Sequence, residues 1–399
     1  MLPKAFYEAA DIIEKLEKHG YKAYFVGGCV RDLLLDRPIG DIDIATSAKP
    51  GTVQKLFQTV IPVGIEHGTV IVRHNRKSYE VTTFRLDGAY SDRRRPDTVH
   101  FTQTIEQDLM RRDFTINALA MNIKGEITDP FAGKRDLEHE MIRTVGDGFD
   151  RFHEDPLRII RALRFSSQLG FQIEANTLQN MTKVAHEIEH LAIERIVDEL
   201  AKLFAGSYIK TGIYYLKYTK LHHHIPVLKD DPSVIDRLPV KLVPLYSLGE
   251  VIAMFHYIEP DIDISTWTKN WKCANRTKHE AMNLSAALFY FQNNGLNQWL
   301  VYRLDDANYN GFVRLAKLFF TDVPTIQDIN RIKKSLPIRT RSELALNGYD
   351  IKAMFPSMKE GPWIRDLLQT VEKKVVNGTL ANNKSALKEW IKWNPPDIN

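Results

Sequence analysis

The sequence predicts an α+β fold in which strands and helices alternate near the N-terminus. A short apolar run over Tyr24–Val26 ends in the pair Gly27–Gly28, and the residues after it have helical spacing. The segment Gly40–Ile44 then alternates between polar and apolar residues, which is typical of a strand with two different faces. Further on, Asp155–Pro156 combines an N-cap residue with a proline at the first helical position, so a helix begins there.

Length and composition indicate a protein of more than one domain. The 399 residues are too many for one compact core, so we expect about two to four domains. No apolar run approaches the length of a membrane span, and the N-terminal segment carries interspersed acids, unlike a signal peptide. Cys29 and Cys273 are the only cysteines, which argues against a disulfide framework or a cysteine zinc site. We therefore expect a cytoplasmic protein with no membrane partner.

The first elements are a helix over Phe6–His19, closed by Gly20, and the strand that leads to the glycine pair. Gly27 and Gly28 place backbone N–H groups beside the start of a helix, an arrangement that suits a phosphate. Glycine is useful there because a Cβ would hold the phosphate away from the backbone. A double glycine alone is weak evidence, and the next segment strengthens it.

Two aspartates, Asp41 and Asp43, share one face of the predicted strand. Close carboxylates repel each other unless a cation lies between them, and a hard divalent ion such as Mg²⁺ is the expected partner. An edge strand with a solvated acidic face is the alternative, and it would be favoured for an isolated Asp-x-Asp. Directly after a turn that can hold a triphosphate, the metal interpretation is favoured instead. The combination indicates phosphoryl or nucleotidyl transfer.

The next predicted elements are a helix over about Gly51–Val60, with Thr52 as its N-cap, and two β segments. The β segments, Gly68–Arg73 and Ser78–Phe84, are joined by a short turn. Alternation in the second segment allows Glu80 to face the same cleft as the two aspartates and to act as a third carboxylate. A plain surface glutamate is an equally good interpretation.

Two groups of arginines follow. The polar segment Asp87–Asp97 predicts a mobile loop, and Arg93, Arg94 and Arg95 within it could reach a triphosphate or RNA. Adjacent loop arginines are more often simply solvated. Arg111 and Arg112 precede an apolar segment, and their forked donors suit a triphosphate or a ribose.

The helix that begins at Asp155 carries a basic stripe, since Arg158, Arg161 and Arg164 recur every three residues. The spacing places Asp155 beside Arg158, a pair that is most often a local ion pair or cap. Near a nucleotide, the carboxylate can instead accept from the exocyclic amine of cytosine or adenine while the guanidinium donates to the adjoining ring acceptor. Uracil and guanine present a keto oxygen at that position, so this chemistry predicts a preference for C and A.

The C-terminal end carries the basic character of the chain. Residues 331–399 contain 13 Lys and Arg against 7 Asp and Glu, an excess greater than the whole-chain net charge of +4. This asymmetry indicates contact with a polyanion, with a solvated basic face as the alternative.

Five segments resemble, in order and spacing, the motifs of the class II tRNA nucleotidyltransferases, the CCA-adding enzymes. They are GGCVRD, DIDIA, RRDFTINALAMN, EDPLRIIRALRF and Glu194-Arg195-Ile196. Near the C-terminus, LPIRTRSELALNGYDI and GPWIRDLLQTVEKKVVNG are similar to the tail of the bacterial members. The resemblance implies a polymerase-β-like nucleotidyltransferase head with a mixed sheet, followed by a mostly helical neck, body and tail. The implied ranges are residues 1–148 for the head, 149–205 for the neck, 206–322 for the body and 323–399 for the tail.

The resemblance also implies roles for individual residues. Asp41 and Asp43 would be the catalytic carboxylates and would hold two Mg²⁺ ions. The implied nucleotide-binding residues are Gly28, Arg31, Arg112, Asp155, Arg158, Arg161 and Arg164. Further candidates are Gly27, Glu80 and Arg111. The basic tail would hold tRNA.

The implied activity is template-independent addition of C, C and A from CTP and ATP to the 3′ end of tRNA, with release of pyrophosphate by two-metal nucleotidyl transfer. CC-adding enzymes, A-adding enzymes and bacterial poly(A) polymerases share the head and neck motifs and stay open as alternatives. Retention of the segment Asp87–Asp97 favours the complete activity, because CC-adding members resemble this family without that loop. An inactive RNA-binding module is the non-enzyme alternative, and intact Asp41 and Asp43 argue against it. The resemblance permits a homodimer.

Overall fold

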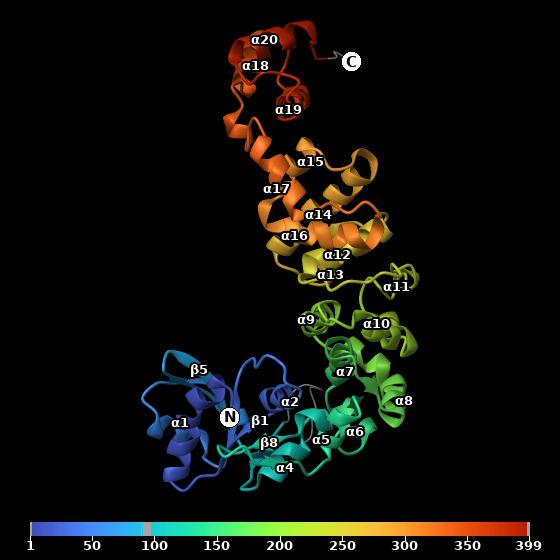
Figure 1. The fold of residues 1–399 in the computed structure, drawn as a ribbon. Coiled ribbons are helices and arrows are strands. Elements are labelled where there is room, and N and C mark those ends of the chain that lie inside the picture. Colours follow the sequence, from blue (N-terminus) through green and yellow to red (C-terminus); the bar gives the residue numbers. More distant parts are fainter. Residues whose placement is uncertain (1, 89, 91–96, 397–399) are drawn as a thin grey trace. The chain divides into compact units, whose positions relative to one another are not determined.

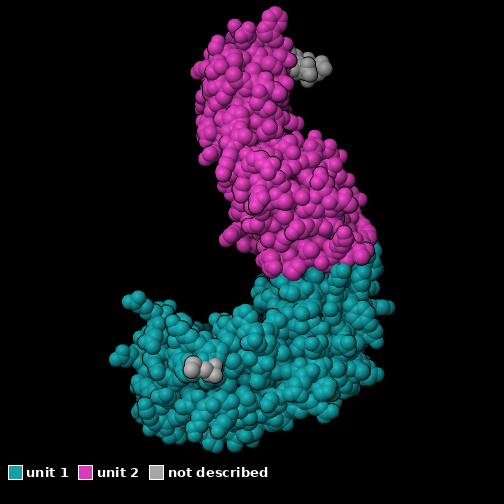
Figure 2. Space-filling model, viewed as in Figure 1, with its two compact units in different colours: residues 1–236 teal, residues 237–399 magenta. Residues whose placement is uncertain are grey.

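The computed structural model describes residues 2–88, 90 and 97–396 and divides the chain into two compact units, which Figures 1 and 2 display. Unit 1 is Met1–Asp236 and unit 2 is Arg237–Asn399. Unit 1 combines a sheet with helices and the described part of unit 2 is helical, so the expected α+β class is confirmed. The finer division into head, neck, body and tail stays a prediction. Over the described ranges, no helix is both long and apolar enough to span a bilayer.

A seven-stranded mixed sheet, in the order β3-β4-β5-β2-β1-β8-β9, forms the first part of unit 1. Its strand β1 is antiparallel to β2 and β8, whereas β2 is parallel to β5. The strands of this sheet are β1 (Ala23–Val26), β2 (Asp43–Thr46), β3 (Val60–Gly64), β4 (Thr69–His74), β5 (Lys77–Thr83), β8 (Ala120–Met121) and β9 (Ile127–Thr128). Two short pairs are β6 (Arg85–Asp87) with β7 (Val99–Phe101), and β10 (Met141–Ile142) with β11 (Gln172–Ile173).

Helices cover this sheet and continue the chain beyond it. Helix α1 (Lys4–Lys18) buries one face, where the ring of Phe6 meets Phe25 of β1 edge-on at 4.9 Å. The α-helices that follow in unit 1 are α2 (Gly28–Leu34), α3 (Pro50–Leu56), α4 (Ile105–Met110), α5 (Gly133–Glu138), α6 (Gly148–Glu154), α7 (Leu157–Leu169), α8 (Ala175–Val184), α9 (Ile193–Phe204), α10 (Ile209–Tyr218) and α11 (Ser233–Asp236). Short 3₁₀ turns are η1 (Ile65–His67), η2 (Thr115–Asn117), η3 (Ala185–His190) and η4 (Leu221–His224).

The helix predicted over Gly51–Val60 is wrong at both ends. Helix α3 begins at Pro50, because a proline loses nothing in the first turn, and Thr52 lies inside that turn without a capping hydrogen bond. The helix ends at Leu56, and Val60 begins the edge strand β3, which pairs with β4. Pairing with a neighbouring strand overrides the local helical pattern there.

Unit 2 is a set of helices joined by short connections. They are α12 (Leu248–Ile258), α13 (Ile264–Asn270), α14 (Asn275–Asn294), α15 (Gln298–Arg303), α16 (Tyr309–Phe319), α17 (Ile326–Ser335), α18 (Gly348–Met354), α19 (Pro362–Val376) and α20 (Lys384–Trp393), with 3₁₀ turns η5 (Asp306–Asn308) and η6 (Arg341–Glu343). Buried Glu250 of α12 accepts two hydrogen bonds from Arg314 of α16, at 2.8 and 2.6 Å. This ion pair therefore links α12 to α16.

Candidate active site

The glycine turn lies between β1 and α2, as the sequence predicts. Gly27 has a φ of +74°, a conformation that residues with a Cβ rarely adopt. A Cβ on Gly27 would also lie 2.7 Å from Nη1 of Arg112. Glycine therefore allows both the turn and the close approach of this guanidinium group.

Asp43, the first residue of β2, lies beside this turn. It is the register partner of Val26, the last residue of β1, and of Glu80 in the parallel strand β5. Asp41 precedes the strand by two residues and is exposed, so only one of the two aspartates lies within the strand itself. Glu80, for which the alternation suggests a role as a third carboxylate, is thus the register partner of Asp43, and that role stays a prediction.

Burial raises the pKa of Asp43 to about 6, and the negative charge of Glu80 contributes to the increase. Arg112 acts in the opposite direction, and Asp41 adds a further repulsion. The carboxylate of Asp43 is thus destabilised as an anion and would gain from a nearby cation.

Arg31 of α2 is held on both sides of its guanidinium group. Its Nε and Nη2 donate to Asp32 at 2.9 and 3.0 Å, and its Nη1 donates to the side-chain oxygen of Asn117 at 2.7 Å. These contacts fix the plane of the group beside the glycine turn.

Arg111 and Arg112 share a buried anion, Asp108 of α4. Asp108 is fully buried and accepts from Arg111 at 3.0 Å and from Arg112 at 3.4 Å. Burial alone would raise the pKa of Asp108, but the two guanidinium groups bring it below its ordinary value. Arg111 also lies 3.7 Å from Asp87. Both arginines are therefore positioned by the ionised carboxylate of Asp108.

Helix α7 begins at Leu157, one residue later than predicted, and presents its arginines to the same region. These side chains are not a solvated stripe, because Arg158 is only 8% exposed and each of the three has an acidic partner. The pairs are Arg158 with Glu154 at 2.5 Å, Arg161 with Asp113 at 2.5 Å, and Arg164 with Glu199 at 3.1 Å.

The expected side-chain pairing of Asp155 with Arg158 is not what the structure has. Arg158 donates to Glu154, one turn before it, and the carboxylate of Asp155 instead accepts from Arg195 of α9 at 3.0 Å. The other oxygen of Asp155 accepts from the backbone N–H of Leu157 at 3.2 Å. Arg195 is therefore a site residue for which the sequence indicated no role, although it lies in the motif Glu194-Arg195-Ile196.

One cavity of about 560 Å³ in unit 1 collects most of the predicted residues. Its lining includes Gly27, Gly28, Arg31, Asp43, Arg111, Arg112, Asp155, Arg158, Arg161, Arg164 and Arg195. Glu80 lines an adjoining cavity of about 400 Å³, together with Arg111, Asp155 and Arg158. Asp41 lines neither of the two. Arg93, Arg94 and Arg95, for which the sequence suggests contact with a triphosphate or RNA, lie outside the described residues.

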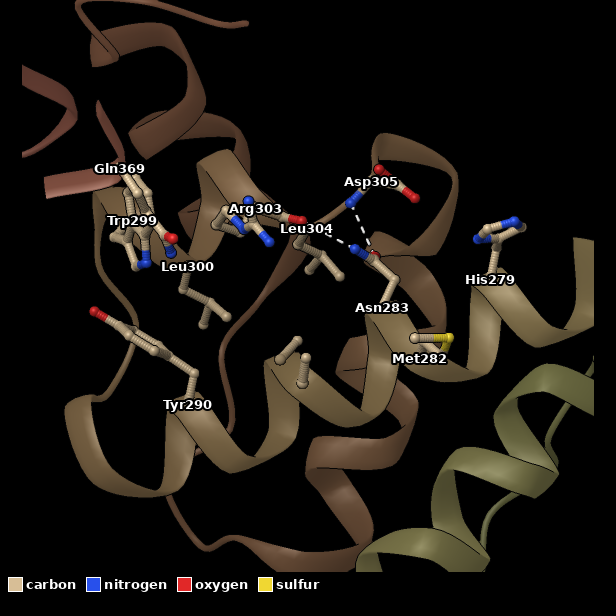
Figure 3. Close-up of a pocket in the computed structure, with 12 residues that line it drawn as sticks. His279, Met282, Asn283, Tyr290, Trp299, Leu300, Arg303, Leu304, Asp305 and Gln369 are labelled. Atoms are coloured by element: carbon tan, nitrogen blue, oxygen red, sulfur yellow. Dashed lines mark hydrogen bonds between the residues drawn. The ribbon is translucent and has the colours of Figure 1, made fainter. Parts of the chain in front are cut away.

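Unit 2 contains a separate cavity of about 480 Å³, drawn in Figure 3. Side chains of α14 and α15 face each other across it, and Asn283 bonds both the carbonyl of Arg303 and the backbone N–H of Asp305. Its lining has a single carboxylate and no glycine turn, so it lacks both the pair of metal-binding carboxylates and the phosphate-binding turn that phosphoryl transfer would need.

The chain matches three family models. The poly A polymerase head domain matches residues 23–143, a probable RNA- and SrmB-binding site of polymerase A matches residues 170–231, and a putative tRNA nucleotidyltransferase domain 2 matches residues 250–391. Together they cover most of both units.

Relatives match over the whole length. The CCA-adding enzyme of Oceanobacillus iheyensis is 48% identical over 402 residues, which is 100% of each chain. That of Anoxybacillus flavithermus is 40% identical over 98% of this chain and 97% of its own. The crystal structure of the Bacillus stearothermophilus CCA-adding enzyme in complex with CTP has a TM-score of 0.87 at 36% identity, over 98% of each chain. The resemblance and the polymerase-type head that it implies are confirmed, and the chain belongs to the family of CCA-adding enzymes.

Proposed function

We propose that this chain adds C, C and A to the 3′ end of tRNA from CTP and ATP, with release of pyrophosphate, and that it does so in the cytoplasm. The observation that carries the assignment of the site is the single cavity whose lining combines the glycine turn and Asp43 with Asp155 and the arginines of α7. These two groups of residues suit the two ends of a nucleoside triphosphate, which are its phosphate chain and its base. Family membership supports the activity itself.

Asp41 and Asp43 are the residues that would hold Mg²⁺. Their oxygen donors suit this ion, and the pKa of Asp43, raised mainly by burial and then by Glu80, indicates a carboxylate that would be stabilised by a further positive charge. Together with the phosphates of the substrate, these two carboxylates would hold the two Mg²⁺ ions of the proposed mechanism. When bound, Mg²⁺ supplies charge neutralisation at the phosphates and lowers the pKa of the attacking hydroxyl.

The phosphate end of the cavity is formed by the glycine turn and by arginines that are already fixed. Gly27 and Gly28 allow two guanidinium groups to lie close to the turn, that of Arg112 at Gly27 and that of Arg31 at Gly28, and both supply positive charge for a phosphate. Arg111 forms an ion pair with Asp108, the same buried aspartate that Arg112 contacts. Because these groups are held before the nucleotide arrives, little side-chain freedom is lost on binding.

At the other end, Asp155 and Arg158 would read the base, with Arg161 and Arg164 beside them. Arg195 donates to one oxygen of Asp155 and so orients this carboxylate, whose oxygens can accept hydrogen bonds from the base. An acceptor at this position suits the amines of cytosine and adenine and leaves a keto oxygen unpaired.

The basic C-terminal segment supports binding of tRNA by residues 323–399, the proposed tail. The head over residues 1–148, the neck over 149–205 and the body over 206–322 complete the proposed organisation. A homodimer is compatible with this proposal, and light scattering would test it.

Incorporation of each single labelled nucleotide into tRNAs that end before, within and after CCA tests the function. We expect incorporation of C into the first two acceptors, of A only after two cytidines, and of nothing after CCA or in the presence of a chelator. Extension of oligo(A) in preference to tRNA would favour a poly(A) polymerase, and incorporation of C alone or A alone would indicate a partial enzyme. Binding of tRNA without any incorporation would overturn the proposal in favour of an inactive RNA-binding module.

A further inference from the structure

A continuous line of hydrogen bonds connects the phosphate end of the cavity with the base-reading helix. Nη1 of Arg31 donates to Oδ1 of Asn117 at 2.7 Å, and Nδ2 of Asn117 donates to Oδ1 of Asp113 at 3.0 Å. The other carboxylate oxygen of Asp113 accepts from Nε and Nη2 of Arg161 at 2.9 and 2.5 Å. The line thus joins α2, η2 and α7, three segments that are far apart in the sequence.

The middle of this line is shielded from water. Asn117 is 6% exposed and Asp113 is 8% exposed. Burial alone would raise the pKa of Asp113, but Arg161 and the Asn117 amide bring it below its ordinary value, so the carboxylate is an anion. Hydrogen bonds to a charge in such surroundings are stronger than those at the surface, and the loss of one partner is correspondingly costly.

The side chain of Asn117 suits its two neighbours in only one orientation. A guanidinium group can only donate hydrogen bonds, and an ionised carboxylate can only accept them. The amide therefore turns its oxygen to Arg31 and its nitrogen to Asp113, and the reversed orientation would lose both bonds. Aspartate would lack the donor and leucine would lack both groups, so an uncharged amide is what this position requires.

Arg31 is left free to bind phosphate although all of its guanidinium nitrogens are held. One N–H on each nitrogen is used by Asp32 and Asn117, and of the five N–H donors two remain, one on each Nη. The same guanidinium lies 5.1 Å from the ring centre of Phe165 on α7, whose ring also packs against Arg161 at 5.5 Å. Arg31 and α7 therefore touch through a second contact, which leaves the hydrogen-bonded line as the directional one.

We infer that Asn117 is a positioning residue that couples the triphosphate-binding Arg31 to the base-reading helix α7 through Asp113 and Arg161. This role rests on the proposed function of the cavity. It predicts that a change at Arg161 is felt at the phosphate end even by a ligand that has no base. It also predicts that this influence depends on the amide of Asn117.

The test is a double-mutant cycle on the full-length protein, with inorganic tripolyphosphate in the presence of Mg²⁺ as the probe. By isothermal titration calorimetry, Asn117→Ala should weaken binding of tripolyphosphate about tenfold. Arg161→Ala should weaken it at least about threefold in the wild-type background and should add nothing in the Asn117→Ala background. The matched control is Asn122→Ala, which removes another asparagine side chain from the turn between β8 and β9 and should leave binding unchanged.

An equal effect of Arg161→Ala in both backgrounds would overturn the inference, because Arg161 would then act on the ligand directly. So would wild-type affinity in Asn117→Ala. If Asn117→Ala does not fold, Asn117→Leu serves in its place, because leucine has nearly the same shape and lacks both the acceptor for Arg31 and the donor to Asp113. Arg161→Ala should add nothing in this background, and a full effect there would refute the coupling. Incorporation of C and A by the wild-type protein tests the proposed function separately.

Discussion

Replacement of Arg195 by alanine should weaken the choice of base while the phosphate end of the cavity stays intact. In the structure, Arg195 donates to Asp155 at 3.0 Å, and only 20% and 15% of the two side chains are exposed. The variant leaves the Asp155 carboxylate with the bond from the Leu157 N–H, which is 3.2 Å long. The carboxylate then becomes free to rotate away from the position in which we propose that it meets the base.

The expected size of the effect follows from these contacts. A hydrogen bond to a charged group contributes about 1.5–3 kcal/mol, and about 1.4 kcal/mol corresponds to a factor of ten. Because the Leu157 N–H still restrains one oxygen and both groups are partly exposed, we expect the lower end of this range. The ratio of kcat/KM for CTP to that for UTP should fall about tenfold.

The assay is single-nucleotide incorporation into a tRNA that lacks CCA, with CTP and UTP compared for each variant. Asp198→Ala is the matched control, because Asp198 lies on the same helix α9 with an exposed side chain. An unchanged ratio, combined with an equal loss of kcat/KM for both nucleotides, would refute the reasoning and reduce Arg195 to a structural role. Thermal unfolding of each variant by circular dichroism separates that outcome from simple loss of fold.

Three further predictions concern charge. Asp43→Asn should lower incorporation from labelled CTP by at least about 100-fold while tRNA binding, measured by filter retention, stays near the wild-type value. Glu250→Gln should lower the free energy of unfolding of unit 2 by about 3 kcal/mol, because it removes the buried negative charge that pairs with Arg314. Urea titrations followed by tryptophan fluorescence would measure this change. The pKa of Asp113 in the folded state lies below its ordinary value of 3.8, so its charged carboxylate stabilises the fold fully above pH 3.8. This stabilisation is lost as the pH falls through the lower folded-state pKa. In acid titrations, Asp113→Asn should therefore lose stability less steeply than the wild type below about pH 4.

The parts of the site that the sequence predicts are those that local chemistry decides. The positive φ of Gly27 needs glycine, and the start of α7 follows from Asp155 and Pro156 within one residue. Both features are set by residues a few positions apart. The strand predicted over Gly40–Ile44 is wrong at its start, because β2 begins at Asp43 and leaves Asp41 outside it.

The partner of each charged side chain was harder to predict because several partners compete. Glu154 and Asp155 lie four and three residues before Arg158, and both spacings allow a contact on a helix. The chain breaks its helix at Asp155, between α6 and α7, which turns that carboxylate away toward Arg195, 40 residues later. Only the packing of α9 against α7 makes this choice, and no periodicity within either helix reveals it.

The acidic partners also offer a physical reason why a cavity with so many arginines would have the proposed selectivity for the base. Each described arginine of its lining contacts a carboxylate: Arg31 with Asp32, Arg111 and Arg112 with Asp108, Arg158 with Glu154, Arg161 with Asp113, Arg164 with Glu199 and Arg195 with Asp155. Arginine side chains without such partners could change conformation to contact different polyphosphates and different bases. A guanidinium group held in one plane cannot move to satisfy a keto oxygen where an amine belongs, so the mismatch keeps its full cost. In the proposed function, the carboxylates therefore contribute to the choice of base by holding the arginines in place.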